Sequence, residues 1–271
     1  MLESIGNHAL AIAVAVVFLV PFVFIVLTAL MTNRQALTSH LWPHPFHWSN
    51  FSQVFHSMPL LRYTWNTVLY AGLATIGVVL SCVPVAYALS RMNWRGRQAS
   101  FILVLSTLML PAQVTIVPLY VIFVKLHWVG SLKPLIVPAF FGDAFSIFLL
   151  RQFFLTIPQE LSDAARVDGA GELQIMTRVI LPLAKPAVAA VALFQFLYCW
   201  NDFFNPLLFS GNNSGAWTLG VALSQFSTIH QGVLWNLQMA ASVLFMLPVI
   251  VLFFLAQRVF IEGVTLTGVK G

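Results

Sequence analysis

The chain has 271 residues, of which 59% are hydrophobic and only 8% are charged. Soluble globular proteins have roughly 45–50% apolar and 25% charged residues, so this composition excludes a soluble fold and predicts an integral membrane protein. The net charge is +5, but the basic residues stand at the ends of apolar segments instead of gathering on one face, which argues against nucleic-acid binding. Cys82 and Cys199 both lie inside apolar runs, where we interpret them as small hydrophobic side chains.

Six apolar runs are each long enough to cross the membrane as a helix, since a crossing needs about 20 residues. They cover residues 9–31, 67–89, 99–123, 135–154, 187–209 and 237–261. We therefore expect an all-α integral membrane fold with six transmembrane helices. Glu3 stands where a signal peptide has basic residues, so we interpret the first run as an uncleaved span.

The basic residues predict the orientation of these spans. If the N-terminus is cytoplasmic, the inner segments carry nine of the 13 Lys and Arg residues and the outer segments carry four. This asymmetry is what the positive-inside rule expects. We therefore predict that both termini, and the segment between the fourth and fifth spans, lie in the cytoplasm.

The longest outer segment, residues 32–66, contains four histidines among prolines. His44 and His47 lack a helix or hairpin that would fix them as metal ligands, so we expect no metal site and interpret the segment as an interfacial loop.

The fifth apolar run contains a group of polar residues. On one continuous helix they would fall within about one third of the circumference. The group comprises Gln195, Tyr198, Asn201, Asp202 and Asn205. A carboxyl group at this depth is costly unless it faces protein or water, so the stripe is a candidate substrate pathway. The alternative is that the stripe attaches this span to a neighbouring subunit.

The fourth run contains a second intramembrane carboxyl group, Asp143, with Gly142 before it and Ser146 one turn further along. We expect Asp143 to line a water-filled cavity or to stand at a helix break. Together, Asp143 and Asp202 also permit an alternative function, a proton-coupled secondary transporter. A membrane scaffold without transport activity would leave the polar stripe unexplained.

Residues 157–182 form the most charged segment and hold four of the eight acidic residues. Pro158 suits the start of a helix, and Glu160 lies near its positive end. Gly169 supplies a turn that ends this helix, and a second short helix runs from Glu172 to Pro182. The segment therefore predicts a cytoplasmic helical hairpin. Its candidate docking residues are Glu160, Asp163, Ala164, Ala165, Asp168, Gly169, Leu181 and Pro182.

The spacing of this hairpin resembles the loop of the permease subunits of bacterial ATP-binding-cassette (ABC) importers, in the maltose-like carbohydrate branch. That loop reads Glu-Ala-Ala, three residues, Gly, nine residues, Ile, one residue, Leu-Pro. This chain has Asp163-Ala164-Ala165, Gly169, Val179 and Leu181-Pro182 at the same positions, with Asp in place of Glu and Val in place of Ile. The resemblance covers roughly residues 66–271 and includes the Trp200-Asn201-Asp202-Phe203 element and the Gly268-Val269-Lys270-Gly271 ending.

The resemblance implies the transmembrane domain of a type I ABC importer, with a coupling hairpin between spans four and five. It implies residues 1–63 as an N-terminal span and outer loop, 64–262 as the transmembrane core with the coupling loop at 155–186, and 263–271 as a cytoplasmic tail. It also implies a sugar or sugar-like solute, a bacterial inner-membrane location, and three kinds of partner: a second permease, two cytoplasmic ATPase subunits and an extracytoplasmic solute-binding protein.

The chain lacks a Gly-x-x-x-x-Gly-Lys-Ser/Thr phosphate-binding loop. We therefore expect that it is not an enzyme, that it holds no cofactor, and that ATP and Mg²⁺ bind to the partner subunits.

Overall fold

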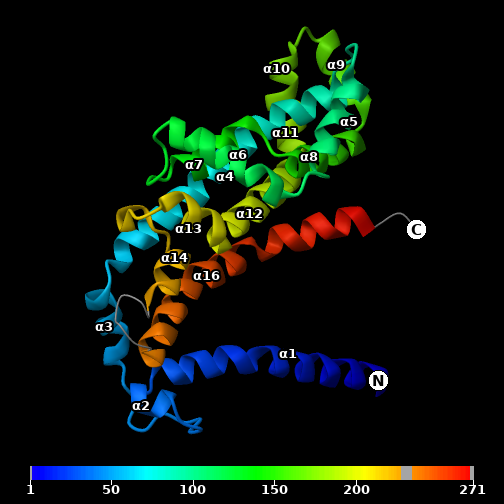
Figure 1. Ribbon diagram of the computed structural model, residues 1–271. Helices are drawn as coiled ribbons and strands as arrows, with labels where there is room; N and C mark the ends of the chain where they lie inside the picture. The colour runs from blue at the N-terminus through cyan, green and yellow to red at the C-terminus, as the bar shows by residue number, and fades with distance from the viewer. Residues whose placement is uncertain (1, 227–233, 269–271) are drawn as a thin grey trace. The chain divides into compact units, whose positions relative to one another are not determined.

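The computed structural model of the chain describes residues 2–226 and 234–268, which contain helices and no strand (Figure 1). The described chain falls into two compact units. The first combines Met1–Tyr63 with Leu219–Leu252, and the second combines Thr64–Thr218 with Phe253–Gly271.

The first unit is built around the N-terminal span. Its helices are α1 (Leu2–Ala29), α2 (Asn33–Ala36), α3 (Ser49–Ser57), α14 (Leu219–Ser224) and the first part of α16 (Trp235–Gly268). Within α1, the segment Gly6–Ala29 is strongly apolar and its most apolar window has no buried residue. A helix that is apolar on all sides is suited to a hydrocarbon environment.

The carbonyl end of α1 is held by a buried asparagine of α3. The side-chain amide of Asn50 donates hydrogen bonds of 2.8 Å each to the carbonyl oxygens of Ala29 and Met31. Its carbonyl oxygen accepts a hydrogen bond of 3.3 Å from the amide of Asn236 in α16. Because the last carbonyls of a helix lack intrahelical partners, Asn50 satisfies groups that burial would otherwise leave unpaired.

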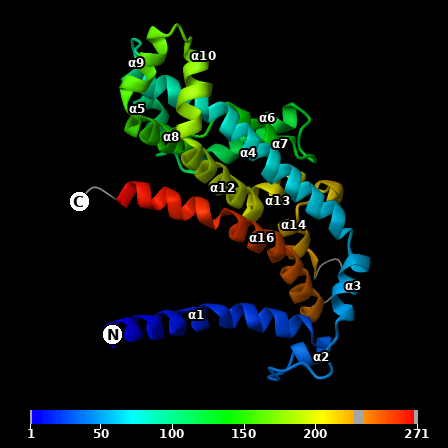
Figure 2. The ribbon, with the colours of Figure 1, turned by 180° about the vertical axis from the view of Figure 1, so that it is seen from behind.

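The second unit surrounds one long helix, α4 (Leu60–Arg91). The other elements are α5 (Arg97–Thr107), α6 (Ala112–Lys125), α7 (Lys133–Ile136), η1 (Val137–Phe141), α8 (Ala144–Thr156), α9 (Gln159–Val167), α10 (Glu172–Ile175), η2 (Met176–Ile180), α11 (Leu181–Leu183), α12 (Lys185–Asn201), α13 (Phe204–Ser210) and η3 (Ser214–Ala216). Its core contains side chains from α4, α5, α8, α10, η2 and α12. Figure 2 shows α9 and α10 beside α5 and α8.

A glycine of α4 allows η1 to pack closely on this helix. A β-carbon at Gly77 would come within 2.8 Å of the Phe140 ring and 3.1 Å of the backbone carbon of Ala139. The hydroxyl of Ser81, one turn further along α4, donates to the carbonyl oxygen of Ala139 at 3.2 Å. The contact fixes the short elements that precede α8.

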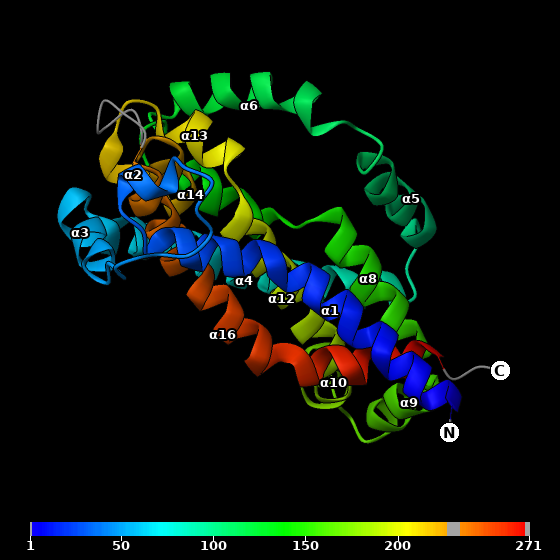
Figure 3. The ribbon, with the colours of Figure 1, turned by 90° about the horizontal axis from the view of Figure 1, so that it is seen from below.

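The prediction of one continuous helix over residues 99–123 is wrong. The chain there forms α5 and α6, which Figure 3 shows separated by a non-helical stretch. The break lies at Leu108–Pro111 because proline has no N–H to donate and disfavours a helical conformation in the residue before it. The described residues contain four helices long and apolar enough to cross a membrane, or five if a pair bent by 81° counts as one span. Six crossings therefore stay a prediction.

The C-terminal helix extends further than expected. The helix α16 continues to Gly268 and so includes the first residues of the predicted tail at 263–271, whereas residues 269–271 lie outside the described residues.

Replacement of Asn50 by Ala should lower the thermal stability of the protein in detergent or nanodiscs. It leaves two carbonyls and the Asn236 amide without their partner, at about 1–3 kcal/mol for each unsatisfied buried group. The measurement is the apparent unfolding temperature. Gln53→Ala, at an exposed position of the same helix, is the control and should leave it unchanged; equal unfolding temperatures for the two variants would contradict the assignment.

Candidate functional site

The charged segment between α8 and α12 folds as the predicted hairpin. Its first arm is α9, and its second arm comprises α10, η2 and α11. Gly169 has a φ of +84°, a conformation that glycine adopts without a steric penalty. The N–H of Gly169 donates to the carbonyl oxygen of Arg166 at 3.0 Å, and the N–H of Ala170 donates to the carbonyl oxygen of Ala165 at 2.9 Å. These two hydrogen bonds close the end of α9. The turn predicted at Gly169 is therefore confirmed.

The second arm of the hairpin is rooted in the apolar core. Ile175 and Ile180 have no exposed surface, and they belong to the same core cluster as Phe154 of α8 and Ala184. The residues Met176–Ile180 form a single π-helical turn. The hairpin is therefore fixed to the helical bundle at its base.

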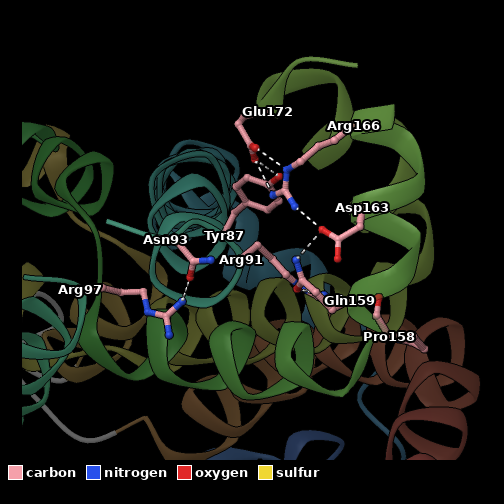
Figure 4. A network of polar contacts seen from close by, with 9 residues as sticks. All are labelled: Tyr87, Arg91, Asn93, Arg97, Pro158, Gln159, Asp163, Arg166 and Glu172. Carbon is pink, nitrogen blue, oxygen red and sulfur yellow. Dashed lines mark hydrogen bonds and ion pairs between the residues drawn. The ribbon is translucent and has the colours of Figure 1, made fainter. Parts of the chain in front are cut away.

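A chain of polar contacts joins the two arms of the hairpin to α4 (Figure 4). Arg166 of α9 contacts Asp163 at 2.7 Å and Glu172 of α10 at 2.9 Å. The hydroxyl of Tyr87 in α4 donates to the second oxygen of Glu172 at 2.6 Å. The hydrogen bond from Arg166, followed by that from Tyr87, lowers the pKa of the Glu172 carboxyl below its ordinary value.

A second contact holds the entrance of the hairpin. Arg91, one turn beyond Tyr87 on α4, is only 4% exposed. Its guanidinium donates to the carbonyl oxygens of Phe154 and Ile157, at the end of α8, and to the side chain of Gln159 at 2.9 Å. A cation is favourable at a helix C-terminus because the last carbonyls carry partial negative charge. We call Tyr87, Arg91, Arg166 and Glu172 the hairpin anchor.

The predicted docking residues lie in different environments. Glu160 and Ala164 are exposed on α9, and Asp168 is exposed at the C-cap position directly after it. Ala165 is half-buried against the core. Asp163 is exposed but paired with Arg166. Gly169 and Pro182 are exposed, and Leu181 is half-buried. Their role toward a partner ATPase stays a prediction.

Tyr87 and Arg91 were not predicted from the sequence as functional residues. Both stand near the end of an apolar run, where they resemble an interfacial tyrosine and a topology signal. Their spacing of one helical turn was the available signal, because it places both side chains on the same face of α4.

The polar stripe expected on one continuous helix over residues 187–209 is wrong in its geometry. The helix α12 ends at Asn201, and α13 begins at Phe204. Asp202 stands at this break, where its Oδ1 accepts the backbone N–H of Asn205 at 3.2 Å. Its Oδ2 accepts the side-chain amide of Asn205 at 3.0 Å and the hydroxyl of Tyr70 in α4 at 2.8 Å. Asp202 therefore joins α4, α12 and α13 within this chain.

A cavity of about 620 Å³ lies within the second unit. It brings together Gln195, Tyr198 and Asn205 from the predicted pathway, and Asp143 also lines it. Asn201 and Asp202 do not line it. The amide of Asn201 donates to the carbonyl oxygen of Leu197 at 2.8 Å. Sequence reasoning missed Tyr70, which lines the cavity and binds Asp202.

The helix break expected beside Gly142 is present. Gly142 has a φ of +97°, and Asp143 is the N-cap residue of α8. One oxygen of Asp143, Oδ2, accepts the backbone N–H and the hydroxyl of Ser146 at 2.8 and 2.6 Å. The position of Asp143 is thus explained by capping as well as by the cavity.

The sequence matches the family described as "Binding-protein-dependent transport system inner membrane component" over residues 74–265. The chain belongs to this family. The predicted resemblance to importer permeases is therefore confirmed, and it displaces the alternative of a proton-coupled transporter using Asp143 and Asp202.

Two curated relatives cover most of the chain. The arabinooligosaccharides transport system permease protein AraQ of Halalkalibacterium halodurans is 35% identical, over 88% of this chain and 85% of its own length. The sn-glycerol-3-phosphate transport system permease protein UgpE of Yersinia pestis is 32% identical, over 94% of each chain.

Two solved structures share the fold. A chain of a bacterial ABC transporter involved in the import of the acidic polysaccharide alginate superposes with a TM-score of 0.84 and 25% identity, over 95% of this chain and 96% of that chain. A chain of a bacterial alginate ABC transporter in complex with a pentasaccharide-bound periplasmic protein has a TM-score of 0.65 and 17% identity, over 94% and 95% of the two chains.

Replacement of Tyr87 by Phe should loosen the second arm of the hairpin. It removes one hydroxyl and its charge-assisted hydrogen bond to Glu172, at about 1–2 kcal/mol. Hydrogen exchange of the backbone amides of residues 172–180 should therefore become roughly tenfold faster. Tyr120→Phe is the matched control, because its ring packs on Phe209 and its hydroxyl has no hydrogen bond among the described residues. Equal exchange in the two variants would contradict the anchor.

The stability of the hairpin anchor should also depend on pH. Because folding lowers the pKa of Glu172, the contact stabilises the folded state fully at pH values above the unfolded-state pKa of about 4.3. This stabilisation is lost as the pH falls through the lower pKa of the folded state. After correction for intrinsic exchange rates, protection of the α10 amides should therefore decrease below about pH 4. Glu172→Gln should remove this acid-dependent part, and a Gln variant with the same pH profile as the wild type would refute the assignment.

Proposed function

We propose that this chain is one of two permease subunits of an ATP-driven sugar importer, and that its hairpin couples transport to ATP hydrolysis on separate subunits. The observation that carries the proposal is the hairpin itself. Its base is fixed to α4 and α8 by the anchor, while its outer surface presents large exposed side chains, including Val167 at 88% and Leu173 at 70%. Apolar groups exposed outside the membrane are typical of a protein-binding surface.

The proposed docking surface consists of the exposed residues of α9 and the turn after it. Ala164 permits close approach of a partner surface because its side chain is small, and Glu160 and Asp168 supply charges that orient the partner. Leu161 and Val167 add apolar area. ATP and Mg²⁺ would bind to the ATPase subunits, in agreement with the absence of a phosphate-binding loop from the sequence.

The anchor gives this docking surface a physical connection to the membrane helices. A movement of the hairpin would displace Glu172 and Gln159. These two side chains are hydrogen-bonded to Tyr87 and Arg91 of α4. Because α4 is a single helix, displacement of its end is transmitted along its length. Closure of the ATPases would thus bias the bundle between two arrangements, which is coupling between distant sites through a two-state element.

The proposed solute route passes the cavity that contains Gln195, Tyr198 and Asn205. Their amides and hydroxyl group can form hydrogen bonds with a hydroxylated solute. Asn201 and Asp202 contribute indirectly, since Asp202 positions Tyr70 and Asn205 at the cavity wall. The names of the relatives include carbohydrates and a polyol phosphate, which share hydroxyl groups, and we propose a hydroxylated, sugar-like solute.

The complete transporter would contain this chain, a second permease, two ATPase subunits and an extracytoplasmic solute-binding protein. The alginate transporter captured with its periplasmic protein supports the last partner by similarity of fold. The excess of basic residues on the predicted inner segments supports an inner-membrane orientation with both termini and the hairpin in the cytoplasm.

Replacement of Ala164 by Arg should uncouple the transporter without unfolding it. Ala164 is exposed, so the larger cation fits the isolated chain but obstructs the docking surface. Co-purification of the ATPase subunits and solute uptake should each fall about tenfold or more, which corresponds to a loss of about 1.4 kcal/mol or more in docking free energy. Membrane insertion should be unchanged. Gln152→Arg, at an exposed position of α8 outside the hairpin, is the control. Wild-type uptake by the Ala164 variant would refute the proposed coupling surface.

A further inference from the structure

The cavity of the second unit has a pronounced charge asymmetry. Asp143 is an acidic residue in its lining, and no lysine or arginine of the described chain lines it. Its volume of about 620 Å³ falls in the range of roughly 300–1,000 Å³ found for small-molecule sites. A solute in this space would therefore meet negative charge without a compensating cation from this chain.

A second carboxyl group reinforces this asymmetry from behind the wall. Asp202 accepts hydrogen bonds from Tyr70 at 2.8 Å and from Asn205 at 3.0 Å, and both donors line the cavity. These bonds use donors that could otherwise have faced an anionic solute. The carboxyl groups of Asp143 and Asp202 thus both lie at or near the cavity. The donors next to Asp202 are already hydrogen-bonded to it.

The remaining polar groups are suited to neutral hydroxyls. Ser146 occupies Oδ2 of Asp143, whereas Oδ1 accepts no hydrogen bond from the described residues. An ionised carboxyl group only accepts hydrogen bonds, so Oδ1 attracts hydroxyl donors and repels carboxylates and phosphates. Gln195 adds an amide that can both donate and accept. Phe145 and Phe194 supply apolar wall beside these groups, as expected for a site that holds the carbon faces of a solute.

We propose that this permease admits neutral polyhydroxylated solutes and discriminates against anionic ones, with Asp143 as the specificity-determining residue. The inference rests on the proposed function as a solute importer and adds the charge class of the solute. Anions are rejected because a like charge next to Asp143 is unfavourable. Neutral sugars have hydroxyl donors for Oδ1 and suffer no such repulsion.

Two substitutions separate the charge of the lining from its shape. Asp143→Asn removes the negative charge and keeps the size, and asparagine still caps a helix, so α8 should remain intact. Gln195→Lys places a cation in the same cavity. Gln98→Lys introduces the same charge at an exposed position of α5 that does not line the cavity, and it controls for the change in net charge.

The test uses the complete transporter, with the second permease and the ATPase subunits, in lipid nanodiscs and without the solute-binding protein, which would impose its own selectivity. Equilibrium binding is measured for a neutral arabinotriose, for sn-glycerol 3-phosphate and for an anionic alginate trisaccharide. We expect the wild type to bind the neutral trisaccharide at least about tenfold more tightly than either anion. Asp143→Asn should reduce this preference, Gln195→Lys should improve binding of the anions about tenfold, and Gln98→Lys should do neither.

Wild-type binding of an anion as tight as that of the neutral sugar, an unchanged preference in Asp143→Asn, or absence of binding of all three solutes would overturn the inference. ATP-dependent uptake by the transporter with its solute-binding protein is measured in parallel. ATP-driven uptake of an anionic solute would refute the charge rule and leave the proposed importer function intact. Failure of every solute to be taken up would refute both.

Discussion

The buried guanidinium of Arg91 is the interaction on which the rest of the second unit depends. Burial of a cation with 4% exposure is costly unless its donors are paired. Both terminal nitrogens of Arg91 are paired, whereas its Nε has no hydrogen-bond partner among the described residues. Here the partners are the terminal carbonyls of α8 and the side chain that opens α9. The same contact supplies acceptors to the buried cation and a charged donor to the carbonyl oxygens at the end of α8. It fixes the point at which the chain leaves α8 and enters the hairpin.

The same helix connects the hairpin with the cavity. Tyr87 and Arg91 hold the hairpin at the end of α4, and Tyr70 binds Asp202 beside the cavity. Tyr87 lies 17 positions after Tyr70, which corresponds to about 25 Å along a helix that rises about 1.5 Å per residue. A docking event at the hairpin and the shape of the cavity can therefore be linked through one continuous helix. This arrangement suits a subunit whose energy source lies on another polypeptide.

The helix breaks near the cavity are built from local capping interactions. Asp143 caps α8 through Ser146, and Asp202 accepts the backbone N–H of Asn205 at the start of α13. Each break brings polar backbone to a membrane-spanning region, where unpaired groups are costly. The two carboxyl groups provide the missing acceptors and at the same time set the charge of the cavity. The position of Asp143 and Asp202 at the helix breaks therefore accounts both for their capping role and for their proposed effect on the solute.

The sequence by itself determined the membrane class, the apolar segments, the hairpin with its turn at Gly169, and the family. These features depend on composition, on the conformational freedom of glycine and on spacing over short distances, all of which are local. Only the tertiary structure decided that α12 stops at Asn201, that Asp202 faces Tyr70, and that Arg91 binds the end of α8. Those partners are separated by 63 to 132 residues in the chain, and a buried charge does not reveal from its own sequence neighbourhood which distant groups will satisfy it.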